Sequence, residues 1–393
     1  MTDSLSSKRI LLLSSNYGDG HQQAAAALRE AIRLGNPDHK PIMLDFMRWF
    51  HPYVYPISRY VFLRGVQKFP SVYGYLFQKT RGVHSSAILK TFNLLSIRRM
   101  VRMIEAVRPS VIVSTFPLAA AAVSLLKEQG LIDLPTVTVI TDHTDHSYWI
   151  HPFTDQYIVG SEPVRRALIR SGVEPSNISV TGIPIRPEFS RLQPKKTIRE
   201  KLGLDPNLPT VLMMGGGVGI LGEGLIDLAS FNHLPHNIQL IIVCGHNQKL
   251  LHRLEEQLPA SRHRVILTGY IDYVHELMNA SDLLITKAGG LTTSEAVAQQ
   301  LPMLFYKSLP GQERDNAKFF LKAGVATEAA DDRDLLEKLA HILSNPQMLW
   351  KMEQNALRFN TKRSAFDAAD IILQVARRPQ TPYYSNQEWI AQL

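Results

Sequence analysis

The chain has 393 residues, 45 % of them hydrophobic and 20 % charged, with a net charge of +8. This is the usage of an ordinary globular protein long enough for two domains. Its single cysteine, Cys244, excludes an internal disulfide and favours a cytoplasmic location. The first residues lack the apolar core of a secretory signal, and no apolar run approaches the roughly 18 residues of a membrane span, so we expect a soluble protein.

The chain opens with a strand, a glycine turn and a helix. A strand is predicted at 10–14, a loop at 16–21 and a helix from Gln22 to about Leu34. His21 would then lie at the start of the helix, at the carboxyl edge of a sheet, where open α/β folds bind ligands. An imidazole at this place can act as a general base, or it can be an ordinary capping or exposed residue.

The next segment, residues 46–104, is basic and aromatic. It contains no Asp or Glu, and its Arg and Lys residues, Arg59, Arg64 and Lys68 among them, account for more than the whole net charge of +8. Cationic and aromatic side chains on amphipathic elements are typical of proteins that bind an anionic membrane surface. Nucleic acid is the competing partner, but no known nucleic-acid module is present, and part of the aromatic set is expected to be core.

Strands and helices alternate through the rest of the N-terminal half. Strands are predicted at 42–44, 111–114, 136–141, 156–159 and 178–180, with helices at 119–128 and 163–170. Such alternation indicates a parallel sheet with helices on both faces. Three prolines punctuate residues 183–196, which we interpret as a linker. We expect domains at 1–182 and 197–360, with residues 361–393 forming a last helix and a tail.

Residues 141–151, after the strand at 136–141, contain three histidines and two aspartates. A zinc site is one interpretation of this cluster. The residues lie in one short loop without the second separated pair that a structural zinc site normally uses, so we predict no metal. The alternatives are a second base, a carboxylate that orients His21, or a loop that shapes an acceptor pocket.

The C-terminal half repeats the α/β pattern. Strands are predicted at 210–214, 239–243, 264–268, 283–286 and 303–306, and Gly215 and Gly216 begin a glycine run after the first of them. The strand at 283–286 leads into Lys287-Ala288-Gly289-Gly290 and a helix from near Thr292, which is a junction suited to binding a diphosphate. Glu295 can accept both ribose hydroxyls there, or it can close a capping box with Thr292.

A second polar loop, residues 310–316, follows the strand at 303–306. The two loops together resemble the donor half of the GT-B glycosyltransferases of family 28, which hold the lipid II N-acetylglucosaminyltransferase and the monogalactosyldiacylglycerol synthase-like enzymes. The resemblance implies an α/β GT-B fold, with two Rossmann-like domains facing across a cleft. It also implies that Glu295 holds the ribose of UDP, that Gln312 contacts the donor sugar, and that the last helix crosses back to the N-terminal domain.

The N-terminal half carries the resemblance as well. Residues 15–21 look like the opening signature of diacylglycerol glycosyltransferases, which makes His21 the expected base, and the Thr-Asp pair at 141–142 with its following His and Trp is similar to the family's acceptor loop. Catalytic roles are expected for His21 and Asp142. Acceptor or membrane roles are expected for Gly20, His146, Trp149, Arg59, Arg64 and Lys68. Donor-binding roles are expected for Gly215, Gly216, Tyr270, Gly289, Gly290, Leu291, Thr292, Glu295, Gln312, Glu313 and Asn316.

The resemblance, which runs from Ile10 to about Ala376, points to the bacterial processive diacylglycerol β-glucosyltransferases. It implies an inverting enzyme on the inner face of the cell membrane that moves a hexose, glucose or galactose, from a UDP-sugar to diacylglycerol. The UDP-sugar is a substrate, and no cofactor is expected. Expected partners are the UDP-sugar, diacylglycerol and anionic lipids, and not nucleic acid. Three other functions stay open: transfer to a polyprenyl-linked cell-wall sugar, epimerisation of a UDP-sugar, and a non-catalytic nucleotide-sugar sensor that binds a protein partner.

Overall fold

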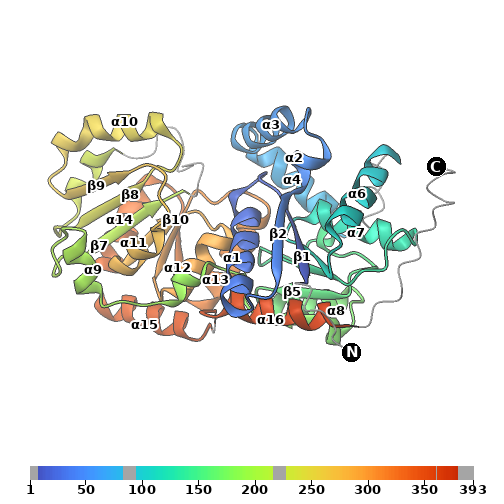
Figure 1. Ribbon diagram of the computed structural model, residues 1–393. Helices are drawn as coiled ribbons and strands as arrows, with labels where there is room; N and C mark the ends of the chain where they lie inside the picture. The colour runs from blue at the N-terminus through green and yellow to red at the C-terminus, as the bar shows by residue number, and fades with distance from the viewer. Residues whose placement is uncertain (1–7, 83–93, 216–226, 360, 379–393) are drawn as a thin grey trace. The chain divides into compact units, whose positions relative to one another are not determined.

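The computed structural model describes residues 8–82, 94–215, 227–359 and 361–378. The chain forms two compact units. Unit 1 consists of Met1–Pro187 together with Arg363–Leu393, and unit 2 consists of Glu188–Lys362. The predicted alternation of strands and helices is present in both units (Figure 1).

Unit 1 is built on a parallel sheet of 6 strands in the order β2-β1-β3-β4-β5-β6. Its strands are β1 (Arg9–Ser14), β2 (Lys40–Asp45), β3 (Val111–Ser114), β4 (Thr136–Val139), β5 (Gln156–Val159) and β6 (Ile178–Val180). The prediction placed the end of β4 two residues too late. The Ile140 amide still donates to the Ile158 carbonyl at 2.9 Å, but the chain leaves the sheet there.

Helices cover both faces of this sheet. The helices of this unit are α1 (Asp19–Gly35), α2 (Phe46–Phe50), α3 (Tyr55–Lys68), α4 (Pro70–Thr80), α6 (Leu94–Val107), α7 (Pro117–Glu128), α8 (Glu162–Arg170) and α16 (Ser364–Ala376), with short 3₁₀ turns at η1 (Ser147–Trp149) and η2 (Pro175–Asn177). A further turn, η3 (Pro187–Ser190), leads from unit 1 into unit 2. Helix α16 begins at Ser364, just after the chain passes from unit 2 to unit 1.

Side chains of β1 alternate between two cores, as the period of a strand requires. Ile10 and Leu12 pack with α1 and α16. Leu11 and Leu13 pack with α2, α6 and α7. All four side chains are buried, which explains why β1 is a continuous apolar run in the sequence.

Unit 2 has a second parallel sheet of 6 strands, in the order β12-β11-β10-β7-β8-β9. Its strands are β7 (Thr210–Met214), β8 (Gln239–Val243), β9 (Arg264–Thr268), β10 (Leu283–Thr286), β11 (Met303–Tyr306) and β12 (Ala326–Ala329). The first five were predicted with these bounds. The edge strand β12 was not predicted, because its sequence, Ala-Thr-Glu-Ala, has no apolar run or alternation of large side chains.

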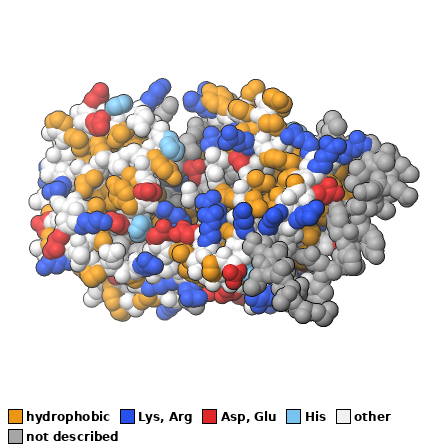
Figure 2. Space-filling model, viewed as in Figure 1, with side chains coloured by type: hydrophobic (Ala, Val, Ile, Leu, Met, Phe, Trp, Pro, Cys, Tyr) orange, Lys and Arg blue, Asp and Glu red, His pale blue; other side chains and the backbone are white. Residues whose placement is uncertain are grey.

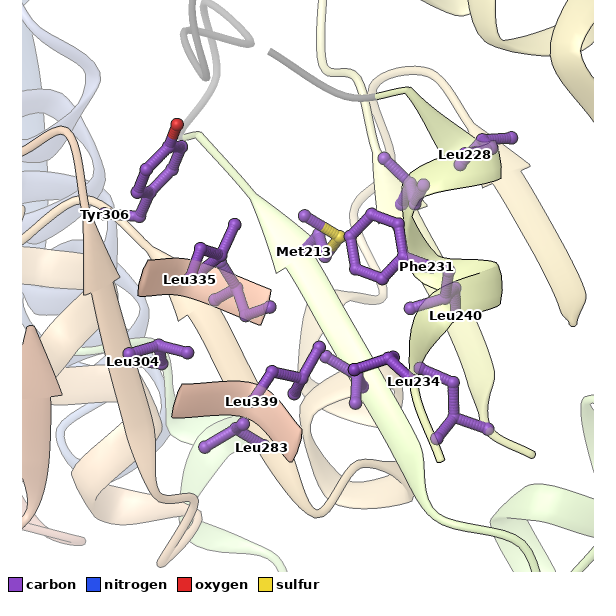
Figure 3. Close-up of a cluster of buried hydrophobic side chains, with 14 of the residues drawn as sticks. Met213, Leu228, Phe231, Leu234, Leu240, Leu283, Leu304, Tyr306, Leu335 and Leu339 are labelled. Atoms are coloured by element: carbon purple, nitrogen blue, oxygen red, sulfur yellow. The ribbon is translucent and has the colours of Figure 1, made fainter. Parts of the chain in front are cut away.

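One core of unit 2 is shown in Figure 3, where Met213, Leu240, Leu283 and Leu304 from the sheet meet Leu335 and other helical side chains. On the opposite face of the sheet, the side chains of Leu212, Ile241 and Leu284 in the central strands are buried too. The helices and turns of this unit are α9 (Lys195–Lys201), η4 (Leu228–His233), α10 (Gln248–Gln257), η5 (Leu258–Ala260), α11 (Val274–Ala280), α12 (Gly290–Ala298), α13 (Gln312–Ala323), α14 (Asp332–Leu343) and α15 (Pro346–Leu357).

Candidate active site

In unit 2 the strand order changes direction between β7 and β10, which pair with Thr286 opposite Met214. Open parallel sheets bind ligands at such a switch point, outside the carboxyl ends of the strands. Gly215 follows β7 and the Lys287–Gly290 loop follows β10, so both loops emerge at this place. Gly216 lies outside the described residues.

Helix α12 begins directly after this loop, at Gly290, with Gly289 as its N-cap. Glycine offers no side chain to cap the helix, and the amides of Gly290, Leu291 and Thr292 have no preceding helical turn to bond with. The helix dipole adds positive potential at the same point. The start of α12 therefore has the donors and the field that a diphosphate needs.

Glu295 is the sixth residue of α12 and is buried, with 7 % of its surface exposed. Thr292 was predicted to begin the helix, which would have made it the cap in a capping box with Glu295. The helix starts two residues earlier, so Thr292 lies inside the first turn and the capping-box interpretation is wrong. The ribose contact of Glu295 stays a prediction.

The loop after β11 is bonded to the loop after β10 through Glu313. One carboxylate oxygen of Glu313 accepts from Lys287 Nζ at 2.6 Å, and the other accepts from the Leu309 amide at 2.8 Å. Both charged side chains are largely buried, with 19 % and 10 % of their side-chain surfaces exposed. Glu313, predicted to contact the donor, thus holds two loops of the site together.

Two further bonds join the same loops. Asn316 Nδ2 donates to the Ala288 carbonyl at 3.0 Å, and the Ala288 amide donates to Ser308 Oγ at 3.1 Å. Gly311 caps α13 with φ of 99°, a backbone conformation that favours glycine, and it places Gln312 as the first residue of that helix. Asn316 therefore contributes to the scaffold of the Lys287–Gly290 loop.

Tyr270 lies at the same carboxyl edge of the sheet, beyond β9. Its ring stacks on that of His246, which follows β8, with centroids 4.4 Å apart and planes 8° from parallel. Tyr270 is 54 % exposed, so much of its side chain is open to solvent. An exposed, pre-stacked aromatic ring can receive a planar base.

In unit 1 the strand order changes between β1 and β3, and His21 lies at this switch point. His21 is the third residue of α1, which starts at Asp19 and not at Gln22 as predicted, because Gly18 is already the extended N-cap. Thr115, just beyond β3, donates from its hydroxyl to the His21 carbonyl at 2.9 Å. Thr141 Oγ1 is 2.8 Å from His21 Nδ1. The ends of three strands thus surround this residue.

The imidazole of His21 is partly buried against aromatic rings. The ring centroids of Phe116 and Trp149 lie 5.4 Å and 5.9 Å from its own. Burial lowers the pKa of His21 to about 4, against the raising effect of a hydrogen bond with the Thr115 backbone. The imidazole is therefore neutral at pH 7, as a proton acceptor must be.

His146 connects the 141–151 loop to α4. Its Nε2 atom is 2.8 Å from the Phe77 carbonyl, and its Nδ1 atom accepts from the Tyr148 amide at 3.3 Å. This pair of bonds requires the neutral tautomer with the proton on Nε2. The ring is buried between those of Phe77 and Tyr148, with centroid distances of 4.3 Å and 4.2 Å. His146 therefore anchors this loop to α4, which fits the alternative in which the loop shapes a pocket.

Several other residues of this loop are buried, whereas Asp145 is exposed and forms an ion pair with Arg81 at 3.4 Å. Asp142 is buried beside Thr141, the partner of His21. Burial lowers the pKa of His143 to about 3 and that of His151 to about 4. Trp149 is completely buried. The described part of the chain holds no group of three or more His, Cys, Asp or Glu residues arranged to bind a metal ion.

Helices α3 and α4, with the turn before α3, expose a set of large apolar side chains, most of them more than half exposed. These are Tyr53, Val54, Ile57, Tyr60, Val61, Phe62, Phe69, Val72, Tyr75 and Leu76. Arg64 is exposed beside them, with its guanidinium 5.5 Å from the centroid of the Tyr60 ring, and Lys68 is exposed at the end of α3. We refer to this set, with Arg64 and Lys68, as the aromatic–basic surface (Figure 2).

Arg59, predicted to face the membrane, is turned toward the protein. It is only partly exposed, and its Nε atom donates to the Asn16 carbonyl at 2.6 Å. No helix within residues 8–82, 94–215, 227–359 and 361–378 is long and apolar enough to cross a membrane.

Comparison with known proteins decides the family. Residues 21–185 match the model of monogalactosyldiacylglycerol (MGDG) synthase, and residues 210–372 match that of the glycosyltransferase family 28 C-terminal domain. The processive diacylglycerol β-glucosyltransferase of Bacillus pumilus is 31 % identical over 358 residues, which cover 91 % of this chain and 92 % of that protein. The chain is a member of the MGDG synthase family of glycosyltransferases. The Bacillus subtilis enzyme of the same name is 30 % identical over 88 % of this chain and 90 % of its own.

Solved structures share the GT-B-like fold of this glycosyltransferase. MurG of Acinetobacter baumannii has a TM-score of 0.59 at 14 % identity and covers 93 % of this chain and 99 % of its own. Anabaena HepE in complex with UDP-glucose has a TM-score of 0.54 at 15 % identity and covers 98 % and 100 %. At this identity the likeness shows the fold alone, and the predicted fold class is confirmed.

Several residues of this glycosyltransferase were given no role of their own by the sequence analysis. Lys287, Ser308 and His246 hold or complete donor-side loops, and Thr115 and Thr141 hold His21. Each acts on a partner far away in the sequence. The usable signal was their position, because all five residues follow strands that reach the ligand edge.

Proposed function

We propose that this glycosyltransferase moves a hexose from a UDP-sugar to diacylglycerol at a membrane surface, with inversion of the anomeric carbon. The observation that carries the proposal lies within unit 1. There the neutral His21 is at the switch point, and the aromatic–basic surface lies on α3 and α4, with α3 bonded to the β1–α1 loop that leads to His21. An acceptor that resides in a bilayer requires both. The curated relatives, named as diacylglycerol β-glucosyltransferases over about nine-tenths of the chain, support the same acceptor.

The proposed chemistry is a single displacement. The acceptor hydroxyl oxygen attacks the anomeric carbon and forms the new glycosidic bond, while His21 takes the hydroxyl proton. The bond from the anomeric carbon to the phosphate oxygen breaks, and its electron pair leaves with UDP. In this proposal the first-turn amides of α12 stabilise the charge on the departing diphosphate, Glu295 binds the ribose, and Tyr270 receives the uracil.

The aromatic–basic surface is proposed to hold the enzyme on the cytoplasmic face of an anionic membrane. Its exposed rings would enter the interface, while Arg64 and Lys68 are attracted to anionic lipid at about 1 kcal/mol each. Reversing both charges, in Arg64→Glu with Lys68→Glu, should lower affinity for anionic vesicles at least about thirtyfold and leave affinity for neutral vesicles little changed. Salt should weaken the binding of the unaltered protein.

The matched control reverses two exposed basic residues on α10 of unit 2, Lys249→Glu with Arg253→Glu. The change in net charge is identical, so a loss of vesicle binding as large as that of the first variant would show that net charge alone drives the attraction. That result, or equal sedimentation of the unaltered protein with neutral and anionic vesicles, would remove the surface from the proposal.

Glycosyl transfer is tested with radiolabelled UDP-glucose or UDP-galactose and diacylglycerol in anionic liposomes. We expect label in the lipid phase, with glucose as the preferred sugar, and a ladder of products if transfer is processive. Label that enters only a polyprenyl-linked acceptor would replace diacylglycerol in the proposal. Conversion of the UDP-sugar without any acceptor would identify an epimerase, and binding without turnover would identify a sensor.

A further inference from the structure

Helix α3 is bonded to the loop that leads into His21. This loop, residues 15–18, follows β1 and ends at the N-cap of α1. Arg59 Nε donates to the Asn16 carbonyl at 2.6 Å, and the hydroxyls of Tyr17 and Ser58 are hydrogen-bonded to each other. Two adjacent residues of α3 therefore hold two adjacent residues of the loop.

Aromatic contacts continue this connection as far as the imidazole. The Tyr17 ring lies 5.9 Å from that of Tyr55 and 5.6 Å from that of Phe62, both on α3. On its other side, Tyr17 lies 6.2 Å from the Phe116 ring, which in turn lies 5.4 Å from the His21 ring. A displacement of the loop thus changes the packing around His21 directly.

The bond from Arg59 matters more to the loop than to the helix. Helix α3 has an anchor of its own, because the Tyr55 hydroxyl donates to Asp45 Oδ2 at 3.0 Å at the end of β2. By contrast, the buried side-chain oxygens of Ser14, Ser15 and Asn16 have no hydrogen-bond partner among the described residues. The loop therefore depends on α3 for polar contacts that its own side chains do not provide.

We infer that Arg59 is a positioning residue: through the Asn16 carbonyl it holds the β1–α1 loop, and hence His21, in the geometry required for proton transfer from the acceptor. This inference rests on the proposed function. It gives Arg59 a different task from that of Arg64 and Lys68 on the same helix, which face outward. It also means that the helix proposed to meet the membrane is the helix that orients the base.

The test uses Arg59→Met, which keeps the aliphatic stem and removes both the donor and the charge. Tyr17→Phe is the milder second variant, because it keeps the ring and removes only the bond to Ser58. Arg33→Met is the matched control, since Arg33 is exposed in the last turn of α1. Turnover is measured with diacylglycerol in saturating anionic vesicles and, separately, with a short-chain diacylglycerol dissolved as monomers.

We expect Arg59→Met to lower kcat at least about tenfold with both acceptors, since a shift of about 1 Å at a reacting group can cost a hundredfold. The KM for the UDP-sugar and the melting temperature should stay close to those of the control variant. Tyr17→Phe should lower kcat in the same direction and by less. Arg33→Met should turn over like the unaltered protein.

Several results would overturn the inference. A deficit that disappears with the monomeric acceptor, or at saturating vesicle concentration, would make Arg59 a lipid contact. A lowered melting temperature in Arg59→Met combined with normal turnover in Tyr17→Phe would show that the bond from Arg59 to the Asn16 carbonyl is purely structural. If the unaltered protein transfers no hexose to either diacylglycerol, the proposed function fails and this inference fails with it; normal turnover by Arg59→Met beside an active parent refutes this inference alone.

Discussion

The buried pair formed by Lys287 and Glu313 offers the sharpest test of how the donor loops are held. We consider the substitution Lys287→Met, which removes the cation and fills a similar volume. The Glu313 carboxylate would then keep its bond from the Leu309 amide at 2.8 Å and lose the ammonium group at 2.6 Å. A largely buried carboxylate with only one donor is costly, because desolvation is no longer offset by an opposite charge.

The expected cost follows from burial. Breaking a fully buried ion pair by removing one partner typically costs 3–5 kcal/mol. Here 19 % of the Lys287 side chain and 10 % of the Glu313 side chain remain exposed, so water can relieve part of the penalty. We therefore expect a loss near the lower limit, about 3 kcal/mol, which corresponds to a melting temperature lower by roughly 6–12 °C for a unit of this size.

The measurement combines calorimetry with hydrogen exchange of the peptides that span 283–323, so that loosening is assigned to the two loops. Arg333→Met serves as the control, because Arg333 and Glu337 form a bridge on α14 with 89 % and 62 % of their side chains exposed. Such an exposed pair should have no measurable effect on melting. UDP affinity should fall in Lys287→Met and remain normal in the control.

Two outcomes would refute this reasoning. An unchanged melting temperature in Lys287→Met would show that the pair adds nothing to the loops. For Glu313, a scaffold role predicts that Glu313→Gln lowers the melting temperature and UDP affinity together. Lost turnover at an unchanged melting temperature would instead assign Glu313 to the donor sugar itself.

Three further predictions concern the histidines and Glu295. His21→Ala should abolish transfer and leave UDP affinity within a few-fold, and loss of UDP binding instead would contradict its role as base. Glu295→Ala should weaken UDP binding by about 2 kcal/mol or more, since two ribose bonds to a carboxylate are lost; titration calorimetry that shows unchanged affinity would exclude the contact. Burial lowers the pKa values of His21, His143 and His151 in the folded protein to about 4, 3 and 4. A histidine in the unfolded chain has a pKa near 6.5, so only the unfolded state takes up these protons as the pH falls from 6.5 toward 4. The free energy of unfolding should therefore be highest above pH 6.5 and decrease as the pH falls toward 4. Urea unfolding at pH 7 and pH 5 should therefore show a smaller acid-induced loss for His151→Gln than for the parent; equal losses would contradict the pKa shift.

The sequence alone determined the two α/β sheets and most of their strands. A strand buried on both faces, such as β10 with its Leu-Leu-Ile run, is mostly apolar, and this pattern is visible without any knowledge of its neighbours. The glycine loop before α12 and the histidine in the first turn of α1 were recognisable for a related reason. Both lie in βα connections that follow such strands, and the carboxyl ends of parallel strands meet at one edge.

Only the tertiary structure decided what the individual polar side chains do. Arg59 and Arg64 lie five positions apart on α3, yet their contacts differ. Arg59 bonds to the β1–α1 loop, whereas the guanidinium of Arg64 lies over the exposed ring of Tyr60. Glu313 and His146 were recognised as polar residues of a site, but their partners, Lys287 and the Phe77 carbonyl, lie 26 and 69 residues away. Local sequence sets strand and helix periods over a few residues, whereas the partner of a side chain depends on how distant segments pack, and no local pattern encodes that.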